Sequence, residues 1–162
     1  MNREQVKAII KLLKSKELNT RPALKQVFEQ GGFLWATDGY VALEVCEVKD
    51  DMKGKRFTFE TLVGWYATHT KRTDMLGTDL AADNDLQVPD MEKILHKEYS
   101  EPSEAPRFNI DFMKLACDFL GVKSITLEQS DKCYRVKPLI EDEMEIMVRA
   151  MESKAYVMGL NR

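Results

Sequence analysis

The residue types that most often carry chemistry are few in this chain and widely separated. His69 and His96 are its only histidines, and neither has a cysteine or carboxylate at the spacing of a metal-binding motif. Asp79, Asp83 and Asp85 lack the glycine and the terminal glutamate of a calcium-binding loop. No nucleophile-elbow, zinc-protease or phosphate-binding glycine motif occurs either. We therefore expect no metal site, no cofactor and no enzymatic activity.

The three cysteines, Cys46, Cys117 and Cys133, are also separated, and no two of them form a CxxC pair. Each lies within an apolar run, which predicts buried free thiols and a reducing compartment. No stretch of 18 apolar residues occurs, so the sequence predicts no membrane span. Together these features favour a cytoplasmic protein.

A stripe of positive charge is the one pattern that favours a ligand. Arg3, Lys7, Lys11 and Lys14 follow one another at spacings of four, four and three residues. On a helix they fall within about 80° of arc, and no acidic residue interrupts them. Lysines often only solvate an exposed helix face, but such a stripe also suits nucleic-acid phosphates. The chain as a whole carries a net charge of −3, so any nucleic-acid contact is expected to be local.

The helix that would carry this stripe is predicted over residues 2–16, with Asn2 as its cap. A second helix is predicted to begin at Thr58 or Glu60 and to continue to His69. A short turn or helix should follow Pro89, and a third full helix should run from Asn109 to Gly121. The expected core residues share apolar character and helical or strand spacing: Val6, Ile9, Ile10, Leu13, Leu34, Val41, Leu43, Phe112, Leu115, Phe119, Ile125 and Leu127.

Strands are predicted where apolar residues alternate. The Asp38-Gly39 pair should form the tip of a hairpin between strands 33–37 and 40–48, and the latter should bury one face. A further strand is expected within 23–29, ending at Gly31-Gly32. In the last third of the chain, strands are expected over 124–129, 133–137, 138–140, 144–151 and 155–160.

The order of these elements predicts one α+β domain over residues 1–162. Units 1–50 and 107–158 each contain a helix followed by strands, which suggests an internal repeat. The connecting segment 51–106 ends in a polar, proline-containing stretch at 97–106, predicted to be a flexible linker. An antiparallel sheet with both helices on one face would bury these apolar stripes.

Several segments resemble the bacterial DNA sliding clamp, the beta subunit of DNA polymerase III. The segment Gly32–Leu43, GFLWATDGYVAL, is similar to a hairpin of that family, and Val88–Leu95, VPDMEKIL, is similar to a later segment. Phe108-Asn109, with the helix that follows, and Met144–Met151 look like further parts of the family pattern. The resemblance implies a reduced, clamp-like single domain made of two helix-and-sheet units.

The resemblance further implies a non-catalytic, replication-related protein that contacts double-stranded DNA without reading its sequence. The contacting residues would be Arg3, Lys7, Lys11 and Lys14, with Lys114 on the second helix. Self-association into a homo-oligomer is compatible with this interpretation. The alternative is a clamp-fold module that binds a protein partner through a sheet edge or an apolar groove. If helices 2–16 and 109–120 lie side by side on an open face, the structure favours DNA binding. If residues 56–96 cover that face, it favours binding of a protein partner.

Overall fold

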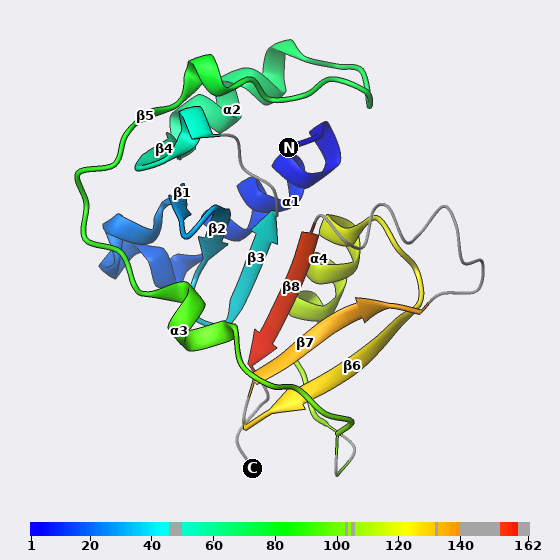
Figure 1. The fold of residues 1–162 in the computed structure, drawn as a ribbon. Coiled ribbons are helices and arrows are strands. Elements are labelled where there is room, and N and C mark those ends of the chain that lie inside the picture. Colours follow the sequence, from blue (N-terminus) through cyan, green and yellow to red (C-terminus); the bar gives the residue numbers. More distant parts are fainter. Residues whose placement is uncertain (46–49, 103, 105, 132, 140–152, 159–162) are drawn as a thin grey trace.

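The computed structural model describes residues 1–45, 50–102, 104, 106–131, 133–139 and 153–158 (Figure 1). Within these ranges the fold is α+β, with four α-helices and one antiparallel sheet of eight strands. The strand order is β5-β4-β1-β2-β3-β8-β7-β6. The strands are β1 (Gln26–Gln30), β2 (Phe33–Thr37), β3 (Val41–Val45), β4 (Lys55–Thr58), β5 (Ala82–Asp83), β6 (Ile125–Ser130), β7 (Cys133–Pro138) and β8 (Ser153–Met158).

The first helix, α1 (Arg3–Leu13), confirms the predicted N-terminal helix and ends three residues early. The Asn2 side chain accepts a hydrogen bond from the Gln5 backbone N–H at 3.0 Å, and the Gln5 side chain accepts one from Asn2. This reciprocal capping box satisfies two of the amide groups that a helix start leaves unpaired. The side chain of Gln5 also donates to Ser153 Oγ at 2.8 Å, which ties α1 to β8.

Two further helices pack on the same face of the sheet as α1 (Figure 1). The helix α4 (Ile110–Leu120) begins at its predicted cap, Asn109, and ends at Gly121, whose φ of 71° is the left-handed conformation that glycine adopts easily. It contacts α1, β3 and β8. The helix α2 (Phe59–Thr68) is capped by Thr58, one of the two predicted starts, and lies beside α1. The three helices therefore form one layer.

The hairpin between β2 and β3 confirms the predicted turn. Asp38 Oδ1 accepts hydrogen bonds from the backbone N–H groups of Tyr40 and Val41, both at 2.9 Å. Gly39 has a φ of 94°, which most other residues would avoid. The Asp side chain thus closes the turn that the glycine permits.

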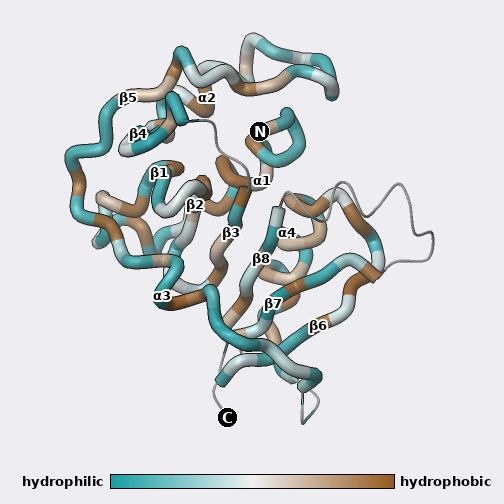
Figure 2. The backbone as a smooth tube through the Cα atoms, in the orientation of Figure 1, coloured by the Kyte–Doolittle hydropathy of each residue, from teal (hydrophilic) through white to brown (hydrophobic). Residues whose placement is uncertain are grey.

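The opposite face of the sheet is also covered, and this corrects one prediction. The short helix α3 (Met91–Leu95) and the residues after it pack over β2, β3 and β8. The strand expected to bury one face consequently buries both, because Ala42 and Glu44 are covered as well as Val41 and Leu43. Hydrophobic residues concentrate in the central strands, whereas the connection after β5 is largely hydrophilic (Figure 2).

The segment expected to be a flexible linker, 97–106, makes ordered contacts in its first residues. Tyr99 is half-buried, and its hydroxyl donates to the Leu95 carbonyl at 3.1 Å. Ser100 forms a reciprocal pair of backbone hydrogen bonds with Gln129 of β6, at 2.6 and 3.0 Å. The chain is therefore attached to the sheet at the start of this segment.

Most of the predicted core is confirmed. Nine of the twelve residues are buried, and Phe112, Ile125 and Leu127 are partly buried at its margin. Cys117 and Cys133 are free, as predicted, but they are only half-buried. Cys46, the end of strand 40–48 and the strands predicted at 138–140 and 144–151 lie wholly or largely outside the described residues.

Candidate nucleic-acid interface

A groove of about 580 Å³ lies in the helical layer and collects five cationic side chains. Lys7, Lys11 and Lys14 line it from α1, and all three are exposed. Arg72 lines it from the loop after α2, and Lys123 lines it from the turn between α4 and β6. The predicted stripe is thus joined by cations from two other parts of the chain.

The walls between these cations are largely apolar. Ala8 and Ile10 contribute from α1, and Val63 and Tyr66 contribute from α2. Cys117 and Val122 complete the lining at the end of α4. Burial and the adjacent Asp118 raise the pKa of the Cys117 thiol, so the thiolate needed for nucleophilic chemistry is disfavoured at neutral pH.

Two carboxylates, Glu4 and Asp118, also line the groove and oppose its positive charge only in part. The Lys7 ammonium lies 4.0 Å from Glu4, and the two side chains are 62% and 37% exposed. An exposed pair at that distance is worth little, because water screens it. Lys7 therefore remains available to an anionic ligand.

Two of the predicted contact residues lie differently. Arg3 does not line the groove: its guanidinium donates to the His69 carbonyl at 2.6 Å and to the Tyr66 hydroxyl at 3.0 Å. It also lies 3.8 Å from the Tyr66 ring centre, so it connects α1 to α2. Lys114 is exposed and does not line the groove, but it shares a face of α4 with Asp118, one turn away.

The arrangement of the helices bears on the two functional hypotheses. The helices α1 and α4 lie side by side, and α2, which belongs to segment 56–96, lies beside α1 on the same face. The helix α2 flanks α1 and leaves Lys7, Lys11 and Lys14 exposed. The three lysines of the basic stripe are therefore uncovered within the described residues, whereas Arg3 packs against α2. The sequence pattern does not indicate Arg72 and Lys123, because their approach to the groove depends on tertiary packing.

A second, smaller groove of about 170 Å³ lies on the other side of the sheet, beneath α3. Met91, Ile94 and Leu95 of α3 form one wall. The opposite wall includes Tyr40 and Ala42 of the β2–β3 hairpin region, with further lining from Tyr156, Val157 and Met158 of β8. Apart from Arg21 at its edge the lining carries no charged side chain, so this groove suits an apolar group.

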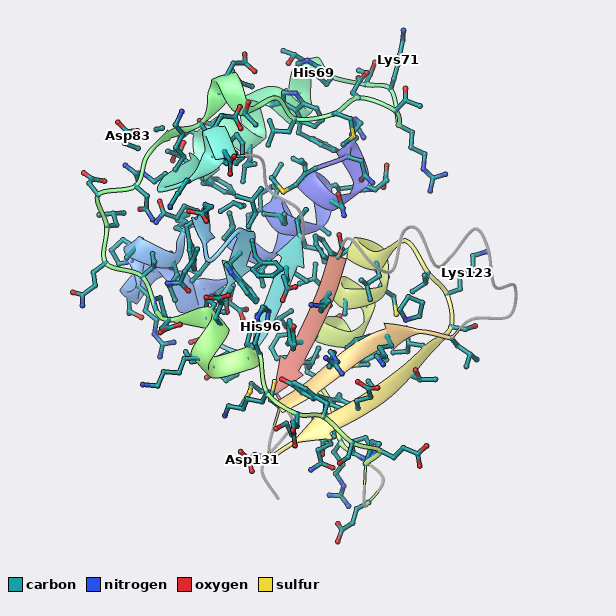
Figure 3. All side chains as sticks on the ribbon, in the orientation of Figure 1. His69, Lys71, Asp83, His96, Lys123 and Asp131 are labelled. Carbon is teal, nitrogen blue, oxygen red and sulfur yellow. The ribbon has the colours of Figure 1, made fainter. Side chains whose placement is uncertain are left out.

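Near this second groove, the carboxylate of Glu44 is fully buried beneath the end of α3. It accepts hydrogen bonds from Tyr156 Oη at 2.8 Å and Lys154 Nζ at 2.9 Å. His96 Nε2 lies 2.8 Å from it and joins α3 to the sheet (Figure 3). Burial, reinforced by the Glu44 charge, raises the pKa of Tyr156 far above its ordinary value. His96, for which the sequence predicts an ordinary surface or half-buried position, is 26% exposed and helps to fix α3 in place.

Among the described residues, no three histidine, cysteine or acidic side chains are arranged to hold a metal ion. None of the helices in the described ranges has the length and apolar character that crossing a bilayer requires. Comparisons of the chain with protein-family models, curated proteins and solved structures find no match.

Proposed function

We propose that this chain is a non-catalytic, sliding-clamp-like protein that contacts the phosphates of double-stranded DNA without reading its sequence. The observation that carries the proposal is the convergence of Lys7, Lys11, Lys14, Arg72 and Lys123 on one open groove. Long cationic side chains on an exposed surface bind the DNA backbone and release its counterions, which requires no base contact. A net charge of −3 over the chain limits adhesion through other surfaces.

The order of the elements supports the clamp-like part of this proposal. The helix α1 precedes the meander β1–β3, and α4 precedes β6, β7 and β8 in the same sheet. Both helices pack on one face, as a duplicated helix-and-sheet unit requires. We propose that the two units are an internal repeat, that copies associate when they bind DNA, and that the protein acts in replication in the cytoplasm.

The experiment is a titration of labelled duplex DNA at several salt concentrations, monitored by fluorescence anisotropy. Lys7→Glu combined with Lys11→Glu should weaken binding sharply. Each lost phosphate contact removes about 0.9 from the slope of log affinity against log salt, so the double variant should lose about two units. Its unfolding free energy should change by less than about 1 kcal/mol, because both side chains are exposed.

A matched control keeps the net charge of the double variant but changes a different surface. Lys53→Glu combined with Lys93→Glu makes the same change at two exposed lysines that do not line the groove. This control should lose much less affinity. Equal losses in both double variants would refute a specific basic groove, and an absence of wild-type binding at low salt would refute DNA contact by the isolated chain.

The second candidate is a protein-interaction module that does not bind DNA, and the apolar groove beneath α3 favours it. Its occupant would be a peptide segment with apolar side chains, to which Arg21 could add one contact with a carboxylate. Ile94 is 48% exposed on the wall of this groove. In selection from a peptide library, the wild type should retain apolar sequences that Ile94→Glu fails to retain. An identical selection by both proteins would refute this candidate.

A further inference from the structure

The basic groove has an apolar lining, and this feature bears on which form of nucleic acid it accepts. Lys7, Lys11 and Lys14 form a row about 10 Å long on α1, from the helical rise of 1.5 Å per residue. Arg72 and Lys123 approach from other elements, and the Tyr66 ring and Val63 of α2 lie in the lining between them. Anion-binding groups therefore border an apolar surface that carries an aromatic ring.

A site that binds duplex DNA through charge alone does not need this apolar and aromatic lining. In a duplex the bases are paired inside, and the sugars and phosphates face the protein, so no base can reach Tyr66 or Val63. A single strand presents its phosphates and the flat faces of its bases together. Single-strand binding sites elsewhere combine these same two elements, a cationic groove and aromatic side chains.

We infer that the groove binds a single-stranded segment of nucleic acid, with phosphates on the lysine row and at least one base against the Tyr66 ring, on the side that the Arg3 guanidinium does not cover. The inference rests on the basic groove of the proposed function and departs from it in one respect: the groove itself holds a single strand, whereas a duplex contacts only the exposed ends of its cationic side chains. Charge complementarity selects a polyanion, and the aromatic lining selects one that carries exposed rings. A groove of about 580 Å³ is within the size range of ligand sites and too small for a duplex to enter.

The test compares three labelled ligands of one length by anisotropy: an oligothymidine, an abasic oligomer with the same phosphates, and a duplex. The oligothymidine should bind at least about 5-fold more tightly than the abasic oligomer, the effect of one stacked base. It should also bind more tightly than the duplex. Equal affinity for the oligothymidine and the abasic oligomer would overturn the inference. Tighter binding of the duplex than of the oligothymidine would also overturn the inference, but it would leave the proposed function intact. Failure to bind all three ligands would overturn both.

Variants of Tyr66 separate stacking from a structural role of the same residue. Tyr66→Leu removes the ring and should abolish the preference for the oligothymidine over the abasic oligomer. Tyr66→Phe keeps the ring but loses the hydrogen bond from Arg3, and it should retain the preference. An equal loss in both variants would show that Tyr66 only positions α2, and this would overturn the inference. Lys7→Gln should weaken both single strands alike and reduce their salt slopes by about 0.7.

Discussion

Removal of the buried carboxylate at Glu44 should destabilise the fold more than almost any other single change. The Glu44 side chain has no exposed surface, and His96, Lys154 and Tyr156 all lie within hydrogen-bonding distance of it. In Glu44→Ala the Tyr156 hydroxyl, which is almost fully buried, loses this acceptor. Lys154 and His96 are 34% and 26% exposed and can turn toward water. Breaking a buried charged pair costs about 3–5 kcal/mol, and we expect a loss in this range.

Urea unfolding followed by circular dichroism measures this loss. Glu44→Gln keeps the shape and one acceptor oxygen, so it should fall between the wild type and Glu44→Ala. Glu98→Ala is the control, because Glu98 is exposed on the neighbouring segment, and its effect should stay within about 0.5 kcal/mol. Hydrogen exchange of residues 91–100 should accelerate in Glu44→Ala, because His96 loses its contact with the sheet.

A double-mutant cycle tests the reasoning directly. Tyr156→Phe removes the donor, so Glu44→Ala should cost less in that background than in the wild type. A loss below about 1 kcal/mol in Glu44→Ala, or additive effects of the two substitutions, would refute the argument that Glu44 is a stabilising acceptor in this position.

Two further predictions concern the packing of α4 and the buried phenols. Leu115 is 5% exposed, so Leu115→Ala should cost about 2–5 kcal/mol in urea unfolding, whereas Lys114→Ala should change little; a loss below about 0.5 kcal/mol would show that the buried face of α4 is misassigned. Burial raises the pKa of Tyr99 and Tyr156 above the ordinary value of 10.0, so their contribution to stability is full below about pH 10 and is lost as the pH rises further. Tyrosinate absorbance from these two residues should therefore develop only as the protein unfolds. The prediction is wrong if a tyrosine ionises before the helical signal is lost and Tyr156→Phe removes that ionisation.

Local signals made the helices and the first hairpin predictable. Asn2, Thr58 and Asn109 are caps that act within one turn of their own helix. Asp38 and Gly39 determine their turn with two short hydrogen bonds and one positive φ. Each of these features depends on residues a few positions apart, which is why the sequence pattern was sufficient.

The covered second face of the sheet was not predictable in the same way. The alternation in β3 predicts one buried face, and the polar residue Glu44 marks the other face as exposed. The cover comes from α3 and Tyr99, which lie in a stretch with little periodicity. Glu44 is tolerated there because His96, Lys154 and Tyr156, all distant from it in sequence, supply hydrogen-bond partners.

The same limit applies to the candidate site. Lys7, Lys11 and Lys14 were identified from helical spacing, and they do line one groove. Arg3 belongs to the same stripe by sequence but is used to hold α2, because Tyr66 and the His69 carbonyl lie within its reach. The position of α2 relative to α1 determines both that Arg3 does not line the groove and that Arg72 does. Tertiary packing sets that position.

The positions of the two grooves make the two functional hypotheses separable. The basic groove lies in the layer of α1, α2 and α4, whereas the apolar groove lies beneath α3 on the other face of the sheet. A charge reversal at Lys7 or Lys11 therefore leaves the apolar groove unchanged, and Ile94→Glu leaves the basic groove unchanged. The sheet between them, including the Glu44 contacts, is common to both. Loss of one binding activity in a variant that keeps the other would assign that activity to its groove, because a general loss of folding would remove both.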